Sequence, residues 1–404
     1  MQDIKFEVLN KVAKTNFKFN ELGKSFKISK FESISPPSVF VGSKLKYPQV
    51  NVGILSPLDK DENAWVYDDS KYWANNDFSI SDILKLRNSL LNSRFKSNVK
   101  DVRLNKKFVE IAKDVAIASK PVDVEIELKN EINVQKNFDK VLTPHGMKGN
   151  LKDARVTSNV KISSKVDKVI NDEIKSSESL NYLYKNNFDV YSLSKILSVG
   201  VLGLKKNKKM VPTRWSITAT DDSIGKNIIS EIKNYPLIND YSLFFGEFLG
   251  NQYLIMLFPE IWSYELFELY YPGSSWNPST DMKASTDSEN YDGRKEYASN
   301  TAGGYYASRL GVLEYLNSIK KQAGVLVIRL ETPSYWAGLG VWVVRESVRK
   351  SMNKEAMKFN SKEEILDSVK KISKIKYNFD CNLILEKSKF LKGLNFQKRL
   401  MEWI

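Results

Sequence analysis

The apolar residues of this chain occur in short runs separated by polar residues and turn formers, and this distribution restricts the folds it can adopt. The longest runs, such as Tyr253 to Phe258 and Val325 to Ile328, fit single buried strands. They are far shorter than the roughly 18 to 20 residues that span a bilayer. The sequence therefore predicts a soluble protein that is not built on membrane-spanning segments.

Helical periodicity and strand alternation are interspersed along the chain. Between residues 122 and 128, apolar residues alternate with acidic ones, which is typical of a half-exposed strand. Gly250 and Asn251 separate two apolar runs and predict a type II′ hairpin. Further expected strands are Val39 to Val41, Val50 to Leu55, Val325 to Leu330 and Val341 to Val344. Expected helices are Ile80 to Phe95 with Ser79 as cap, Lys106 to Ala118, Glu178 to Asn186, Ser192 to Val199, a helix ending near Gln322, and one capped by Ser361.

The length of 404 residues exceeds what one hydrophobic core usually supports, so we expect two domains and a tail. The stretch from Ser274 to Tyr291 is rich in Ser, Thr, Asp, Asn and Gly, and marks the expected boundary. The predicted class is α+β (mixed α/β). A larger domain over residues 1–280 has a mixed sheet with helices, a smaller α/β domain covers 290–385, and a basic tether with a short tail covers 386–404.

The chain is strongly basic, with 62 basic and 48 acidic residues and a formal net charge of +14. Such an excess favours a polyanionic partner, of which DNA is the natural example. Lys and Asn are abundant along the whole chain, however, and nucleotide bias in the genome would give the same composition.

The scarcity of cysteine and histidine excludes several kinds of site. With Cys381 as the single cysteine, the chain has no intramolecular disulfide and no multi-cysteine metal site, and without a signal peptide the expected compartment is the cytoplasm. A catalytic triad would need His145, the only histidine, and no nucleophile motif lies near it. The chain also lacks a phosphate-binding loop of the ATP-driven motors.

Residues 211–225 contain the densest group of reactive side chains. We interpret them as a strand through Thr218, a turn at Asp221 and Asp222, and a helix. At that helix N-terminus, the two carboxylates could be caps, or they could bind Mg²⁺ for phosphodiester chemistry with an arginine nearby. The catalytic candidates are Arg214, Asp221, Asp222, Arg329 and Glu331, with Glu265 as a further carboxylate and Mg²⁺ as the one cofactor such a site would need.

Two groups of residues are candidates for binding nucleic acid. Basic side chains contact phosphates and aromatic rings stack on bases. The candidates are Lys205, Lys206, Lys208 and Lys209 in a basic loop, and Tyr305, Arg309, Tyr335 and Trp336 in the C-terminal half. Core aromatic residues at a domain interface, and a solvated lysine face, are the alternative interpretations.

The last eight residues place Gln397, Leu400, Trp403 and Ile404 at offsets of 0, 3, 6 and 7. In a tight helical turn the three apolar residues would form one plug. The pattern resembles the interaction motif of the sliding clamp PCNA, although Ile404 replaces the usual second aromatic residue. The alternative is a terminal helix packed on its own protein through Phe390, Leu391, Leu394, Leu400 and Trp403.

Separate segments of the chain together resemble the archaeal Nre family. The segments are residues 36–42 with 50–53, 211–225, 303–309, 340–346 and the tail. The resemblance implies an N-terminal domain to about residue 280, a C-terminal domain from about 290, the clamp motif on the tail, and a role in DNA damage repair. Family members can carry an N-terminal cysteine cluster, which this chain lacks.

Three functions follow as hypotheses. The first is a DNA repair factor that PCNA recruits and that contacts DNA through basic surface. The second is a metal-dependent, nuclease-like enzyme acting on DNA or a nucleotide at the junction of Arg214 and Asp222. The third is a clamp-bound protein adaptor without DNA contact.

Overall fold

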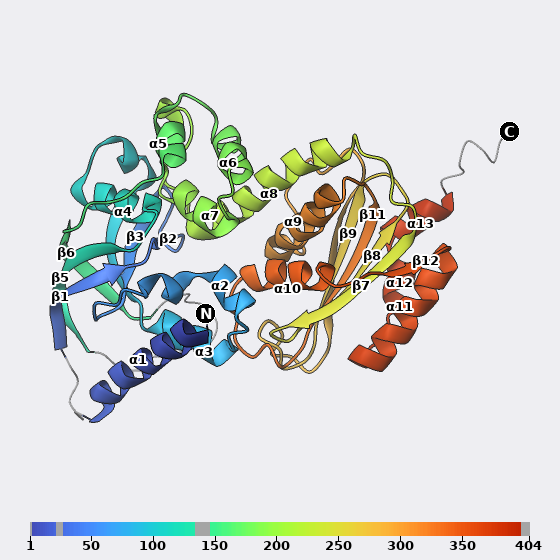
Figure 1. The fold of residues 1–404 in the computed structure, drawn as a ribbon, viewed down its shortest axis with the longest axis horizontal. Coiled ribbons are helices and arrows are strands. Elements are labelled where there is room, and N and C mark those ends of the chain that lie inside the picture. Colours follow the sequence, from blue (N-terminus) through green and yellow to red (C-terminus); the bar gives the residue numbers. More distant parts are fainter. Residues whose placement is uncertain (1, 22–26, 134–145, 397–404) are drawn as a thin grey trace. The chain divides into compact units, whose positions relative to one another are not determined.

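The computed structural model describes residues 2–21, 27–133 and 146–396, which form two compact units. The first unit is Met1–Ile224 and the second is Gly225–Ile404. Each contains a six-stranded sheet with helices packed on it (Figure 1). The predicted α+β class is therefore confirmed. Within the described ranges, no helix combines the length and the apolar character needed to cross a membrane.

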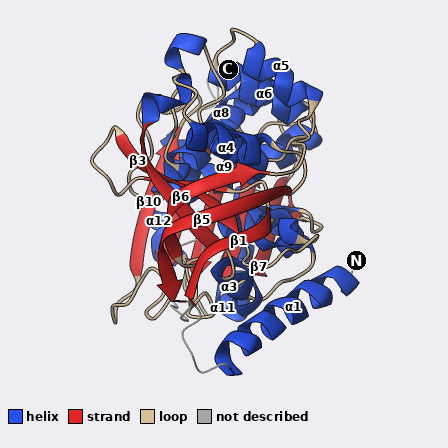
Figure 2. Cartoon of the chain, turned by 90° about the vertical axis from the view of Figure 1, so that its left-hand side faces the viewer, coloured by secondary structure: helices blue, strands red, loops and turns tan. Residues whose placement is uncertain are grey.

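The sheet of the first unit has the strand order β1-β5-β6-β4-β3-β2. Its neighbours pair antiparallel, except for β4 and β6, which run parallel. Figure 2 looks onto β1, β5 and β6. The strands are β1 (Lys27–Ser35), β2 (Val39–Gly42), β3 (Gln49–Ser56), β4 (Leu91–Asn98), β5 (Val122–Asn133) and β6 (Lys148–Val156).

Helices surround this first sheet. The amphipathic α4 packs against β2, β3, β6 and α7, while α1, whose Val8 and Val12 are buried, packs against α3. The helical segments are α1 (Gln2–Glu21), η1 (Ala64–Asp68), α2 (Ser70–Asn75), α3 (Ile80–Asn88), η2 (Val99–Arg103), α4 (Lys107–Ile117), α5 (Ser164–Asn171), α6 (Ser176–Lys185), α7 (Val190–Ser198), η3 (Lys205–Asn207) and α8 (Thr213–Ile232), which continues into the second unit.

The sheet of the second unit has the order β10-β9-β11-β8-β7-β12. Here β9 and β11 are parallel and the other neighbours are antiparallel. The residues of β11 are all buried, as expected for a central strand covered on both faces. The strands are β7 (Tyr241–Phe248), β8 (Asn251–Phe258), β9 (Ser263–Tyr270), β10 (Lys283–Glu289), β11 (Gly324–Glu331) and β12 (Met357–Phe359).

Helices cover both faces of the second sheet. On one face α10 packs against β7, β8 and α9, and on the other α11, α12 and α13 close a hydrophobic core (Figure 1). That core contains Leu326, Ile328 and Leu330 of β11, and Leu391 of α13. The helices are α9 (Ala302–Ser318), α10 (Trp342–Met352), α11 (Lys362–Tyr377), α12 (Asn382–Lys387) and α13 (Lys389–Phe396).

Several sequence-based expectations are confirmed. The acidic strand is β5, and the helices expected over Lys106 to Ala118 and near Gln322 are α4 and α9. Ser79 caps α3 through the backbone N–H of Asp82, and Ser361 caps α11. A hairpin does connect β7 to β8, but its turn is of type I′, because Leu249 and Gly250 have φ angles of 49° and 74°.

Three predicted elements are wrong. The strand expected over residues 211–218 is the start of α8, and the one over 341–344 is the start of α10. Both segments are rich in Thr or Val, which favour strands locally, yet Val343 and Val344 are buried in a helix, so tertiary packing outweighs their propensity. The helix expected from Ile80 to Phe95 ends at Asn88, and β4 follows it.

The compact units divide the chain at a different place from the expected domain boundary. Residues 280–290 lie inside the second unit, because β10 pairs with β9 along its whole length. The polar composition of residues 274–291 reflects a loop and an edge strand there. His145 lies outside the described residues.

Candidate nucleic-acid interface

Two exposed aromatic rings contact each other on the surface of the first unit. Tyr47, in the loop between β2 and β3, lies against Trp215 in the first turn of α8. The ring centroids are 5.9 Å apart, the planes are tilted by 41°, and the residues are 48% and 51% exposed. Tryptophan is largely buried in most proteins, so a half-exposed tryptophan supported by a second ring is an informative feature.

Backbone hydrogen bonds hold the segments around this pair together. The carbonyl of Pro48 accepts from the N–H of Val99 at 3.0 Å, and the carbonyl of Val99 accepts from Met210 at 2.9 Å. The hydroxyl of Thr213, which begins α8, accepts from the N–H of Val41 at 2.9 Å. The β2–β3 loop, η2 and the segment before α8 are therefore fixed side by side.

Exposed basic residues occupy all three segments. Lys44 and Lys46 precede Tyr47 in its loop, and Arg214 precedes Trp215. Asp101 is the only acidic residue in residues 43–49, 98–103 and 205–215. Asp101 is buried, and Lys106 pairs with it at 3.0 Å. We call the following set the basic-aromatic surface: Lys44, Lys46, Tyr47, Lys100, Lys209, Arg214 and Trp215.

The predicted basic loop contributes Lys209 to this surface, and its lysines differ in exposure. Lys205, Lys206 and Lys209 are exposed around η3. The ammonium of Lys208 instead donates to the carbonyl of Ile170 at 2.7 Å, and burial lowers its pKa. Lys208 therefore holds the loop in place, and its neighbours are the ones whose charges face solvent.

The predicted junction at residues 211–225 is a continuous helix from Thr213 onward. Pro212 precedes α8, its carbonyl accepts from Trp215 and Ser216, and the helix runs unbroken past Asp221 and Asp222. These two carboxylates are 1% and 5% exposed in mid-helix, so the expectation that they cap a helix N-terminus is wrong. Arg214 is exposed in the first turn of α8, whereas Asp221 is buried seven residues further on, about 10 Å along the axis, so the predicted group of an arginine and two carboxylates at one helix N-terminus does not form.

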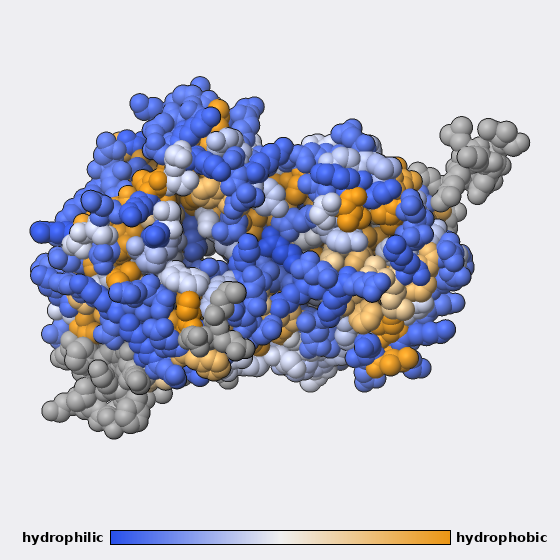
Figure 3. All heavy atoms as spheres, in the orientation of Figure 1, coloured by the Kyte–Doolittle hydropathy of each residue, from blue (hydrophilic) through white to orange (hydrophobic). Residues whose placement is uncertain are grey.

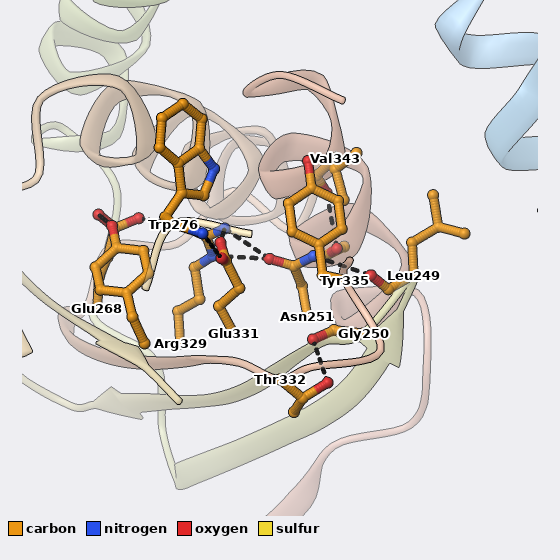
Figure 4. Close-up of polar contacts among 12 residues, drawn as sticks. Leu249, Gly250, Asn251, Glu268, Trp276, Arg329, Glu331, Thr332, Tyr335 and Val343 are labelled. Atoms are coloured by element: carbon orange, nitrogen blue, oxygen red, sulfur yellow. Dashed lines mark hydrogen bonds and ion pairs between the residues drawn. The ribbon is translucent and has the colours of Figure 1, made fainter. Parts of the chain in front are cut away.

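In the second unit, Arg329 and Glu331 are brought together in a buried ion-pair network (Figure 4). The Arg329 guanidinium bonds Glu268 at 2.6 Å and Glu331 at 2.9 Å, and the amide oxygen of Asn251 accepts from its Nε and Nη2. The parallel register of β9 and β11 places Glu268 beside Arg329. We call Asn251, Glu268, Tyr270, Arg329 and Glu331 the Arg329 network.

Protein groups neutralise the charges of this network. Burial opposes the charge on Arg329, but the Glu268 carboxylate beside it, with Glu331, raises its pKa well above the ordinary value. Burial raises the pKa of Glu331, whose carboxylate accepts from the N–H of Trp276. Two carboxylates and one amide accept all the hydrogen bonds described for the guanidinium, and these bonds connect the carboxyl ends of β9 and β11.

The remaining catalytic candidates do not form a metal site. Glu265 is buried and accepts from the N–H groups of Lys389 and Phe390, so it caps α13. Across residues 2–21, 27–133 and 146–396, no group of three or more His, Cys, Asp or Glu side chains could hold a metal ion. Asp221 and Asp222, where Mg²⁺ was expected, therefore belong to no such group in that part of the chain.

The aromatic candidates of the second unit are mostly buried. Tyr305 and Tyr335 are 0% and 2% exposed, and Arg309 pairs with Glu289 at 2.7 Å inside the unit. Only Trp336, at 45%, offers a ring to solvent. Tyr305, Tyr335 and Arg309 therefore contribute to the interior of the unit and do not form a surface on which bases could stack.

Sequence reasoning missed Tyr47 and Trp215. The signal available was local: Lys44, Lys46 and Tyr47 interleave basic and aromatic residues, and Trp215 directly follows the candidate Arg214. Figure 3 shows that hydrophilic residues cover most of the face it displays, with hydrophobic residues in scattered groups. Nothing in the sequence indicates that these two rings meet, since this depends on the contact between the β2–β3 loop and α8.

Comparison with known proteins identifies the family. Residues 6–277 match the region described as "Archaeal Nre, N-terminal" and residues 289–403 the region described as "Archaeal Nre, C-terminal". The chain is 42% identical to DNA repair protein NreA of Archaeoglobus fulgidus, over 82% of each chain. It is 40% identical to DNA repair protein NreA of Haloferax volcanii, over 79% of this chain and 77% of that one.

DNA repair protein NreB of Archaeoglobus fulgidus is 37% identical, over 89% of this chain and 88% of that protein. No solved structure matches the chain. Since both family regions match and these relatives are covered over most of their length, the chain belongs to the archaeal Nre family.

Proposed function

We propose that this chain is a DNA repair protein that contacts DNA through the basic-aromatic surface and that the sliding clamp PCNA recruits it to DNA. The repair role is supported by relatives at 37–42% identity that are named DNA repair proteins. The DNA contact is supported by the exposed cations and rings around Trp215, which are the side chains that bind phosphates and bases.

The clamp contact rests on the sequence of the tail. Gln397, Leu400, Trp403 and Ile404 lie outside the described residues. The helix that precedes them, α13, is fixed to the sheet by the Glu265 carboxylate and by Phe390, which packs on Phe258 at 5.0 Å. The alternative of a docked terminal helix accounts for Phe390, Leu391 and Leu394, which pack on the core. We assign Leu400 and Trp403 to the clamp.

DNA contact is tested by measuring affinity for DNA as salt is raised. Each phosphate that the protein neutralises releases counterions, so binding through this surface weakens steeply with salt. Clamp binding that persists while DNA binding is absent, or is indifferent to salt, would replace this proposal with an adaptor role.

Clamp recruitment is tested by calorimetric titration of the clamp. Leu400→Ala with Trp403→Ala removes the two apolar side chains that the clamp would bury, so we expect at least about a 100-fold loss of affinity. The control variant, Met401→Ala with Glu402→Ala, changes the same tail away from the motif and should bind normally. If the anchor variant binds as tightly as the natural chain, or if neither binds and the anchor variant is strongly destabilised, the clamp assignment fails.

A further inference from the structure

We infer that Tyr47 and Trp215 stack on an unpaired base, so that the basic-aromatic surface prefers single-stranded DNA over duplex DNA. This rests on the proposed DNA contact and adds the form of DNA that the surface takes. A surface of cations alone would bind both forms through their phosphates. The aromatic pair is the feature that distinguishes between them.

The geometry of the pair suits stacking on a base. Because Tyr47 and Trp215 contact each other at a 41° tilt and each is about half exposed, Tyr47 supports one side of the indole and ring surface remains open to solvent. Paired bases in a duplex stack on their neighbours and present only their edges in the grooves. An open ring face is therefore usable by a base that is already unstacked.

The pair is held in place before DNA arrives. The N–H of Trp215 donates to the carbonyl of Pro212 at 2.8 Å in the first turn of α8. Gln49 donates to the carbonyl of Lys46 at 3.0 Å, which closes the turn that carries Tyr47, and Val99 ties that turn to η2. The backbone that carries the two rings therefore needs little ordering at binding, which lowers the entropic cost of stacking.

Charges flank the rings in the arrangement that a single strand requires. Arg214 is adjacent to Trp215, Lys44 and Lys46 lie on the loop of Tyr47, and Lys100 lies on η2 beside that loop. A strand whose base rests on the ring pair would have its phosphates within the field of these cations. Trp276 provides a contrast: it is also 51% exposed, but it lies next to Glu331 of the Arg329 network.

The test compares labelled oligothymidylate with a duplex of equal length by fluorescence anisotropy at one salt concentration. We expect tighter binding of the single strand by the full-length protein. Trp215→Ala should weaken single-strand binding by about 5- to 150-fold, since stacking of one base supplies that range. Duplex binding should change less than about twofold, because its bases are already stacked on one another.

Two further substitutions separate stacking from folding and from bulk. Trp215→Phe keeps an aromatic face and should retain most of the single-strand affinity, whereas Trp215→Leu keeps apolar volume and should behave like Trp215→Ala. Trp276→Ala removes an equally exposed tryptophan of the other unit and should leave both affinities unchanged.

The outcomes distinguish this inference from the proposed function. Equal affinity for both forms of DNA, or an equal loss for both on Trp215→Ala, would overturn single-strand stacking while the salt-dependent DNA contact stands. Absence of salt-dependent binding to either form would overturn the DNA contact itself, and the inference with it.

Discussion

The basic-aromatic surface and the Arg329 network contain the same kinds of side chain, basic and aromatic, in opposite environments. Around Trp215, arginine and lysine face solvent with few acidic residues nearby. Around Arg329, two carboxylates and an amide enclose the guanidinium, and the neighbouring Tyr270 donates to Glu268 at 2.8 Å. The comparison shows that a basic residue in the sequence contributes to binding a polyanion only if its charge is not already neutralised inside the fold.

The contrast bears on the net charge of +14. Arg309 and Arg329 are neutralised by Glu289, Glu268 and Glu331 within the second unit. The exposed lysines of the first unit keep their field in solvent. Composition alone gives these residues equal weight, and burial separates the charges that are neutralised inside the fold from those that could face a polyanion.

The largest effect is expected from Arg329→Ala. It leaves Glu268 and Glu331 buried without their partner, which costs about 3 to 5 kcal/mol of unfolding free energy. Urea denaturation, with hydrogen exchange at β9 and β11, measures the loss in the second unit. DNA affinity of the remaining folded protein should be unchanged.

The matched control is Arg214→Ala on the exposed surface. It should change the unfolding free energy by no more than about 0.5 kcal/mol and should weaken DNA binding. If Arg329→Ala were as mild as Arg214→Ala in denaturation, the network would not stabilise the sheet, and the contrast between the two regions would be lost.

A smaller effect is expected from removing Lys44, Lys46 and Lys100 together by alanine substitution. Each neutralised phosphate contributes about 0.7 to the slope of log affinity against log salt for single strands, so the slope should fall by about 2. Affinity measured at several salt concentrations gives this slope directly.

The control removes the same charge elsewhere, by Lys370→Ala, Lys371→Ala and Lys374→Ala on α11. Both triple variants lower the formal net charge from +14 by three. If the α11 variant reduces the slope as much, binding follows overall charge and the basic-aromatic surface has no special role.

The sequence predicts those parts of the fold whose local pattern agrees with their environment. The alternation in β5 and the caps of α3 and α11 are read correctly, since each depends on residues close together in the chain. It mistakes the start of α8 for a strand, because the Thr-rich segment has strand propensity and only packing in the folded unit reveals a helix.

The candidate site residues are predicted less well than the fold, because their contacts join segments that are far apart in the sequence. Glu331 and Arg329 are near in sequence and were both candidates, but Glu268 is 61 residues from Arg329 and joins it only through the parallel pairing of β9 and β11. Tyr47 and Trp215 likewise meet only after the β2–β3 loop and α8 are assembled. Lys205, Lys206 and Lys209 are candidates from the sequence because they belong to one basic run, and the structure places all three at exposed positions.

The smallest effect is expected from Glu331→Gln, which tests how the network holds two carboxylates on one guanidinium. Burial raises the pKa of Glu331 above its ordinary value of 4.5, so the folded protein binds this proton more tightly than the unfolded chain does. The unfolding free energy should therefore decrease as pH rises from 4.5 through the raised pKa. The substituted amide is neutral at every pH, so Glu331→Gln should lose less stability over that range.

Urea denaturation at successive pH values measures this difference, which should be smaller than the loss caused by Arg329→Ala because Glu268 still pairs with Arg329. Glu355→Gln, at an exposed position of the same unit, controls for a change in net charge. Profiles of the natural chain and Glu331→Gln that run parallel would mean that Glu331 is ionised in the fold as readily as in water. The Arg329 network would then resemble the exposed surface in its electrostatics, and burial would not be what separates the two regions.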